Sequence, residues 1–178
     1  MSENFLLSDD HFNLFGRITY LYADLEVGLK FLCSAMLRID SGIFMMLSEP
    51  YNTRDTRNIV TSIANAATFE NEEEKAIIVQ FAGDLKGASK LRNYIAHCKW
   101  TKGNRENSIR PFILNIRSGK IVTKGTNPED EDFTLDDLIK AHDNLAGSCK
   151  RLRKFITDYG YEAIIAENME EARPDNET

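Results

Sequence analysis

An apolar stripe near the N-terminus constrains the fold of this chain more than any other feature. The spacing of its members, alternating steps of four and three, predicts one helix of about seven turns with all of them on one face. This helix should begin near Ser8-Asp9-Asp10, where short oxygen side chains can accept hydrogen bonds from the first free amides. Such a helix must bury its apolar face against other helices. The stripe consists of Leu14, Ile18, Leu21, Leu25, Leu29, Leu32 and Met36.

Two later stripes have the same helical period and predict two more long helices. The first contains Ile78, Phe81, Leu85, Ala88, Leu91, Ile95 and Cys98. We expect its helix to include Lys90–Trp100 as its last two to three turns and to stop at Gly103-Asn104. The second contains Leu138, Leu145, Cys149, Leu152, Ile156 and Tyr159, and Thr134 with Asp137 predicts its N-terminal cap. A shorter helix is expected from about Thr53 to Ala67.

Between the last two long helices the period changes from helical to alternating. Phe112, Leu114 and Ile116 share one face, and Ser118-Gly119 can form a two-residue turn. The sequence therefore predicts an all-α, up-and-down helical bundle with one inserted β-hairpin at about residues 109–124. Residues 1–165 are expected to form a single domain, and residues 166–178 an acidic, disordered tail.

Length and composition agree with an ordinary water-soluble domain. The chain has 178 residues, of which 42% are hydrophobic and 28% charged. No apolar run reaches the roughly 18 residues of a membrane span, and no secretory signal is recognisable. The three cysteines, Cys33, Cys98 and Cys149, are widely spaced, as expected of reduced thiols. A cytoplasmic protein without a membrane anchor is therefore expected.

Charge is distributed unevenly along the chain. From Leu85 to Lys124 there are ten basic residues and one acidic residue, a charge of +9, so the chain's net charge of −6 leaves −15 for the remainder. A concentrated positive region is typical of a surface that binds a polyanion. The alternative is that this segment packs beside the acidic stretches Glu70–Glu74 and Glu129–Asp137. Both interpretations stay open at this point.

The basic segment opens with three polar residues that flank the predicted core stripe. On an ideal helix Arg92 and His97, five residues apart, point about 140° away from each other, whereas Asn93 and His97 share one face. Arg92 and His97 thus lie on opposite sides of the stripe. A site that uses both is built most easily across a symmetric dimer, where two helix ends meet.

The hexapeptide Arg92-Asn93-Tyr94-Ile95-Ala96-His97 resembles the Arg-x4–6-His motif of the HEPN superfamily (higher eukaryotes and prokaryotes nucleotide-binding), in its RNxxAH form. The resemblance implies a HEPN-like up-and-down bundle of four to five helices. The order of the predicted helices resembles that of the family over about residues 8–165, but the residues themselves are similar only over about residues 85–100. Cys98-Lys99-Trp100 lacks the His-x-Tyr extension of one branch of the family.

The resemblance implies a metal-independent endoribonuclease, of the kind found among toxins and antiviral defence proteins, that acts as a homodimer without a cofactor. His97 would exchange protons with the RNA, Arg92 would hold the phosphate, and Asn93 would orient one of them. A restraining protein such as an antitoxin is a further expected partner. The residues expected to attract the RNA backbone are Lys99, Lys102, Arg105, Arg110 and Arg117.

Other interpretations are kept beside this one. The chain could be a non-catalytic HEPN-like dimer that binds RNA, a nucleotide or a protein, with Arg92 paired to Glu26 or to an acid of the last long helix, and His97 capping its own helix. For Tyr94 and Trp100, stacking on a base competes with packing in the core. A metal site would need the three histidines to converge with carboxylates, and the chain has no Glu-x-x-His pair.

Overall fold

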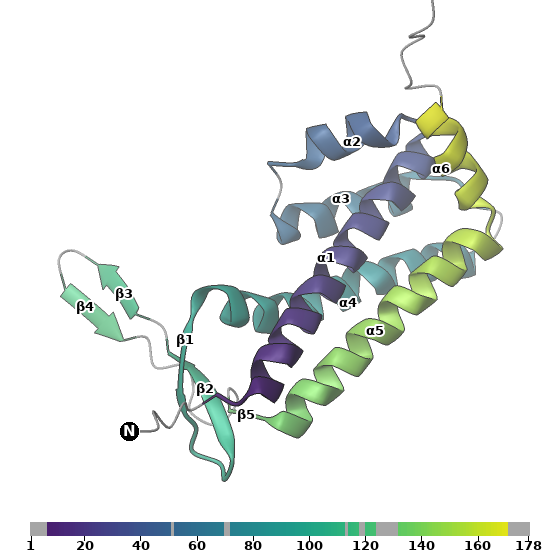
Figure 1. The fold of residues 1–178 in the computed structure, drawn as a ribbon. Coiled ribbons are helices and arrows are strands. Elements are labelled where there is room, and N and C mark those ends of the chain that lie inside the picture. Colours follow the sequence, from purple (N-terminus) through teal and green to yellow (C-terminus); the bar gives the residue numbers. More distant parts are fainter. Residues whose placement is uncertain are drawn as a thin grey trace, which may run out of the picture. The chain divides into compact units, whose positions relative to one another are not determined.

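A computed structural model of the chain describes residues 7–50, 52–69, 72–112, 114–117, 120–123 and 132–170 (Figure 1). The described part is mostly helical and has a small three-stranded antiparallel sheet, so the predicted helical class is confirmed. Its helices are α1 (Asp9–Leu37), α2 (Ser41–Ser48), α3 (Thr53–Ala66), α4 (Glu72–His97), α5 (Leu135–Asp158) and α6 (Tyr161–Glu170). Its strands are β1 (Lys99–Lys102), β2 (Ser108–Phe112), β3 (Leu114–Arg117), β4 (Lys120–Thr123) and β5 (Phe133–Thr134).

The chain forms two compact units, each built from two separate stretches of sequence. The first unit comprises residues 1–20 and 90–144, and the second comprises residues 21–89 and 145–178. The boundaries fall within α1, α4 and α5. The first unit contains the Arg92–His97 motif and all five strands of the described residues.

Two long helices begin where the sequence predicts. The Ser8 carbonyl oxygen accepts hydrogen bonds from the first amides of α1, including that of Phe12 at 3.2 Å. At the start of α5, Thr134 and Asp137 form a reciprocal pair. The Asp137 amide donates to Thr134 Oγ1 at 3.2 Å, and the Thr134 amide donates to Asp137 Oδ2 at 3.0 Å. Both predicted starts are therefore confirmed.

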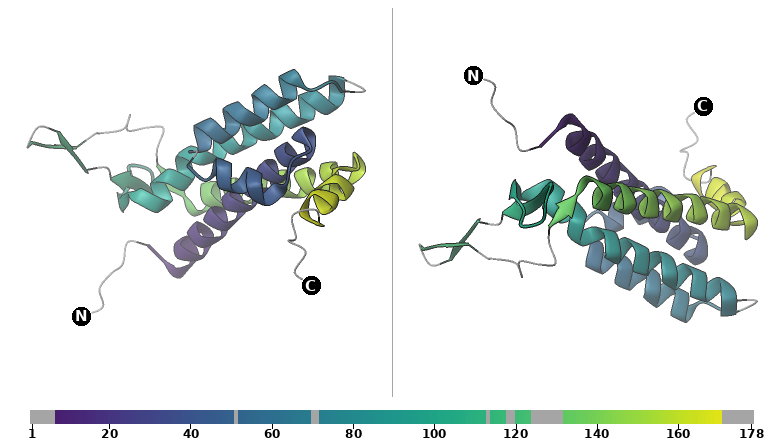
Figure 2. Two further views of the ribbon diagram at one scale, coloured as in Figure 1. Left: turned by 90° about the horizontal axis from the view of Figure 1, so that it is seen from above. Right: turned by 90° about the horizontal axis from the view of Figure 1, so that it is seen from below.

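The second unit is held by a buried apolar core and by polar contacts from α6. The α1 stripe supplies Leu25 and Leu29, which are fully buried. In both views of Figure 2, α3 runs alongside the first part of α4. The Tyr161 hydroxyl donates to Glu74 Oε1 at 2.6 Å, and burial, then this bond and the charge of Glu74, raise the pKa of Tyr161 well above its ordinary value. The Asn168 amide group donates to the Ile39 carbonyl oxygen at 3.0 Å.

The predicted end of the helix that carries the stripe from Ile78 to Cys98 is wrong. Helix α4 stops at His97, and Lys99–Lys102 forms strand β1, although we expected Lys99 and Trp100 to be helical. Strand β1 pairs antiparallel with β2, with Lys99 opposite Phe112. Its Trp100 ring stacks on Phe15, with the ring centroids 4.8 Å apart. Tertiary pairing and aromatic packing therefore override the local helical pattern.

The predicted hairpin is present but shorter than expected, and a separate sheet was missed. Strands β3 and β4 pair with Arg117 opposite Lys120, as a two-residue turn requires, although residues 118 and 119 lie outside the described residues. The preceding strand, β2, instead lies between β1 and β5. Residues 109–112 therefore belong to the three-stranded sheet, whose order depends on pairing between distant segments.

Two short helices of the second unit differ from the prediction. Helix α2 forms over Ser41–Ser48, a stretch for which the sequence predicts no helix. The Asp40 carboxylate caps it by accepting a hydrogen bond from the Ile43 amide at 2.7 Å. Helix α6 extends to Glu170, so residues 166–170 are helical instead of part of a tail. Residues 171–178 lie outside the described part.

Candidate functional site at the end of α4

The Arg92–His97 motif occupies the last turns of α4, where its polar side chains reach the surface. Asn93 and His97 are exposed, and Arg92 is half-buried. Arg92 Nη1 donates to Asn93 Oδ1 at 3.2 Å. Because Asn93 and His97 lie four residues apart on one face, this bond draws the guanidinium toward the histidine side of the helix. The Arg92 and Asn93 side chains are therefore joined within one chain.

The motif is anchored by the aromatic residue at its centre. Tyr94 is buried, and its ring meets that of Phe133 edge to face, with the centroids 6.4 Å apart. The ammonium of Lys90 lies 5.7 Å from the centre of the Tyr94 ring, within the range of a cation–π interaction. The buried position of Tyr94 therefore agrees with packing in the core and not with stacking on a base. Lys90 is exposed and adds a positive charge one turn before Asn93.

Two of the five basic residues expected to bind RNA are held by carboxylates. Arg110 Nε lies 2.9 Å from Asp132 Oδ1. Arg105 Nη2 lies 2.6 Å from Asp137 Oδ2 and also donates to the Asp132 carbonyl oxygen. These two arginines therefore follow the alternative interpretation, in which the basic segment packs beside acidic residues. Lys99 and Lys102 are exposed, and the Arg117 side chain lies outside the described part.

Asp132 is the centre of this arrangement, and the sequence did not identify it. Its buried carboxylate accepts hydrogen bonds from the Asn104 amide and, at 2.9 Å, from the Arg105 amide. Burial by itself raises the pKa of Asp132, but these two amides, the charge of Arg110 and the Ser108 hydroxyl together lower it below its ordinary value. Asp132 is therefore ionised and fixes the β1–β2 turn to the start of β5. We call this arrangement the Asp132 clip.

An open groove of about 620 Å³ lies beside the motif in the first unit and was also missed. Tyr20 and Phe12 on its wall are 69% and 52% exposed, unusually high values for large aromatic or apolar side chains. The sequence signal was a second face of α1, on which Phe12, Gly16 and Tyr20 recur every four residues. The groove is lined by Leu7, Phe12, Phe15, Gly16, Thr19 and Tyr20, by Ile95 and Cys98 near the end of α4, and by Trp100 of β1.

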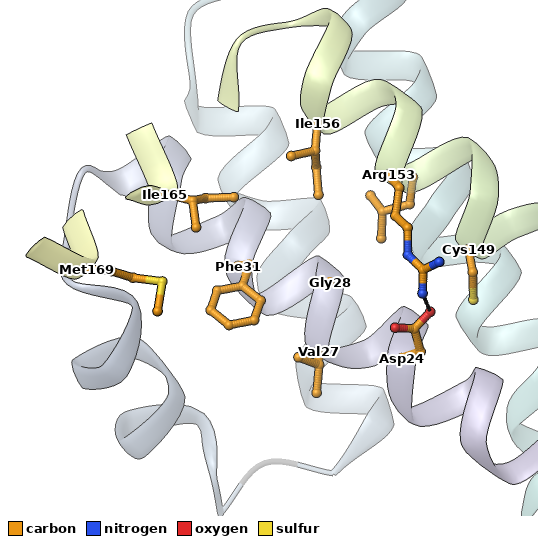
Figure 3. Close-up of a pocket in the computed structure, with 10 residues that line it drawn as sticks. Asp24, Val27, Gly28, Phe31, Cys149, Arg153, Ile156, Ile165 and Met169 are labelled. Atoms are coloured by element: carbon orange, nitrogen blue, oxygen red, sulfur yellow. Dashed lines mark hydrogen bonds and ion pairs between the residues drawn. The ribbon is translucent and has the colours of Figure 1, made fainter. Parts of the chain in front are cut away.

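The second unit has a separate apolar pocket of about 370 Å³ (Figure 3). An ion pair between Arg153 Nη2 and Asp24 Oδ2, 2.6 Å apart, lines it, and Cys149 lies beside this pair. Burial, followed by the nearby Asp24 carboxylate, raises the pKa of Cys149 to about 11. A thiol that stays protonated is a poor nucleophile. The pocket therefore offers space for an apolar molecule, but Cys149 does not give it a reactive group.

Other potential chemistry is limited in the described residues. Cys33 is buried, and burial raises its pKa to about 12. His142 Nδ1 lies 2.9 Å from Asp143 Oδ1. Within the described ranges, no group of three or more histidine, cysteine, aspartate or glutamate side chains is placed to hold a metal ion. No helix in this part of the chain is both long and apolar enough to span a membrane.

Comparison with known proteins gives no family assignment: no protein-family model, curated protein or solved structure matches this chain. The resemblance of Arg92–His97 to the HEPN motif therefore stays a prediction that rests on these residues alone.

Proposed function

We propose that this protein is a metal-independent endoribonuclease of the HEPN type, acting as a homodimer. The observation that carries the proposal is the arrangement at the end of α4. There, an exposed His97 shares a face with Asn93, and Asn93 in turn binds the Arg92 guanidinium. This arrangement places an imidazole, which can act as a general acid or base, on the same helix face as an asparagine that binds a cation suited to phosphate. Helical organisation and the position of the motif late in a long helix support it.

The residues can perform transesterification of RNA. One imidazole removes the proton of a 2′-hydroxyl, and the resulting oxygen forms a bond to the adjacent phosphorus. The bond between phosphorus and the 5′-oxygen breaks, and a second imidazole gives that oxygen a proton. The Arg92 guanidinium stabilises the negative charge that builds on the phosphoryl oxygens. The products are a 2′,3′-cyclic phosphate and a 5′-hydroxyl.

Two copies of the chain are needed because each contributes one His97 to this scheme. In an in-line displacement the attacking 2′-oxygen and the leaving 5′-oxygen lie on opposite sides of the phosphorus, so the imidazole that takes a proton from the first cannot also reach the second to give it a proton. A twofold arrangement of two α4 ends provides both histidines and two Arg92–Asn93 pairs around one cleft. The exposure of His97 and Asn93 in a single copy is compatible with such an assembly.

Among the five predicted RNA-binding residues, we assign the backbone contacts to Lys99 and Lys102. Both are exposed directly after the motif, and Lys90 lies on its other side. Arg105 and Arg110 are assigned to the Asp132 clip because carboxylates already neutralise them. The contribution of the lysines to binding should decrease as salt concentration rises, since it depends on displacing counterions from the RNA.

The test is cleavage of single-stranded RNA by the purified protein in EDTA. His97→Ala should lower the cleavage rate about 10²- to 10⁴-fold and Arg92→Ala about 10²- to 10³-fold. His142→Ala and Arg54→Ala are matched controls, because they make the same changes on other helices and should leave the rate unchanged. Circular dichroism and sedimentation would show whether each variant keeps its fold and its assembly state.

The proposal would be contradicted if His97→Ala cleaved RNA at the rate of the parent protein, or if the products carried no 2′,3′-cyclic phosphate. A folded, dimeric protein that binds RNA but does not cut it would favour the alternative of a non-catalytic HEPN-like binding module. The engagement of Arg105 and Arg110 in ion pairs removes two cations from the surface available to RNA, whether the protein cuts RNA or only binds it.

A further inference from the structure

We infer that the groove between the start of α1 and the end of α4 binds a nucleobase of single-stranded RNA, next to the phosphate held by the motif. The inference takes its ligand class from the proposed function and adds a subsite to it. It assigns a role to the exposed aromatic side chains of α1, which neither the proposed catalysis nor the core of the first unit uses. The groove belongs entirely to this unit.

The walls of the groove suit a flat aromatic ligand. Tyr20 and Phe12 project from α1 with 69% and 52% of their surfaces exposed. At the other end, the half-buried Trp100 ring is fixed by stacking on Phe15 and by an edge-to-face contact with Phe133, with the centroids 6.0 Å apart. Unpaired bases of single-stranded RNA are held by stacking on aromatic side chains of this kind. A volume of about 620 Å³ leaves room for a base and part of its ribose.

The charges around the groove suit the phosphates on either side of that base. Arg92 precedes the groove residue Ile95 by three positions on α4, which places the two side chains next to each other on the helix surface. On α1 the exposed Arg17 precedes Tyr20 by the same three positions. A basic residue therefore flanks each wall, so the phosphates on either side of a bound base can lie near Arg92 and Arg17.

The polar groups of the groove are too few to read the identity of the base. The Thr19 hydroxyl is already committed, because it donates to the Phe15 carbonyl oxygen at 2.8 Å. Cys98 is at most a weak donor. Recognition should therefore depend on stacking area, with purines bound more tightly than pyrimidines and no strict sequence requirement.

The single tryptophan of the chain provides a direct assay, because Trp100 lines the groove. The probe is a 2′-O-methyl tetra-adenylate, which the proposed chemistry cannot cleave because its 2′-oxygen is blocked. The comparison ligand is an abasic tetranucleotide with the same number of phosphates. We expect the adenylate to change Trp100 fluorescence in a saturable way and the abasic backbone to change it little. Tyr20→Ala should weaken adenylate binding roughly 5- to 100-fold, the expected effect of one lost stacking contact.

Tyr159→Ala, which removes an exposed tyrosine in the second unit, is the matched control and should bind like the parent. Equal responses to the two ligands, no response to either, or equal binding by Tyr20→Ala would overturn the inference. Since no step requires cleavage, this result is independent of the EDTA assay. Base-dependent binding without cleavage would refute the ribonuclease proposal alone, and cleavage without base-dependent binding would refute the subsite alone.

Discussion

Replacing Asp132 with asparagine should destabilise the first unit substantially, although the two side chains have nearly the same shape. Asparagine can still offer one oxygen to the Asn104 and Arg105 amides, but those bonds lose the strength that a charged acceptor provides. Its amide group would face Arg110 Nε, now 2.9 Å from a carboxylate oxygen, where two donors cannot bond to each other. Breaking a buried charge pair costs about 3–5 kcal/mol. Because the Arg110 side chain is 21% exposed, we expect about 3 kcal/mol.

The assay is urea unfolding followed by both tryptophan fluorescence and helical circular dichroism. Trp100 lies in β1, so its fluorescence reports on the sheet that the Asp132 clip stabilises. A loss of about 3 kcal/mol corresponds to a decrease in melting temperature of roughly 6–12 °C for a chain of this size. Asp136→Asn is the matched control: it removes an exposed charge in the first turn of α5 and should cost less than about 1 kcal/mol. If the Asp132 and Asp136 variants differ by less than 1 kcal/mol, the reasoning is wrong.

The pH dependence of the same variant provides a second check. The pKa of Asp132 is lowered in the folded protein, so its ionised form stabilises the fold at any pH above the unfolded value of about 3.9. This contribution is lost as the pH falls through the lower, folded pKa. The difference in unfolding free energy between the parent and Asp132→Asn should therefore be constant from pH 7 to about 5 and decrease below pH 4. A difference that grows under acid would contradict the assignment.

Three further predictions concern packing and reactivity. Gly28→Ala should lower the free energy of unfolding by about 1 kcal/mol, because an added Cβ would lie 2.8 Å from Leu152 Cδ2. At Gly83 an added Cβ meets no atom within 4 Å, so Gly83→Ala should raise the free energy of unfolding by about 0.5–1 kcal/mol, as measured by thermal or urea unfolding. Tyr161→Phe should cost about 1 kcal/mol in urea unfolding, because it removes the donor to a buried carboxylate. A thiol reagent should label Cys98 first in the native protein, and label the two buried cysteines only after unfolding; equal labelling rates would contradict their burial.

The sequence predicted the helices well because their periodicity is a local property. The α1 stripe and the Thr134–Asp137 cap each involve residues within a few turns of one another, and both are present. The predicted end of α4 was too late in the sequence, because Cys98 continues the apolar spacing of the helix beyond its last residue, His97. Strand β1 instead depends on pairing with β2, which no local pattern reports.

The candidate site could be predicted in its composition but not in its surroundings. Arg92, Asn93 and His97 were identified by residue type and spacing, and the structure adds only how the first two are joined. The ion pairs of Arg105 could not be foreseen, because its carboxylate partner Asp137 lies 32 residues further along the chain. The groove could not be predicted, because its prediction requires knowing which face of α1 other elements leave uncovered. Apolar periodicity identifies only the face that is buried.

The position of the β3–β4 hairpin has a consequence for how this protein can vary. Strands β2 and β5, on either side of it in sequence, already pair directly, with Ile109 opposite Phe133. The Asp132 clip holds the same junction, so the hairpin is an insertion into a site that is closed without it. Lengthening such an insertion costs little, about 0.6 kcal/mol for each doubling of its length. The hairpin can therefore change in length and sequence among variants while the end of α4 keeps its geometry.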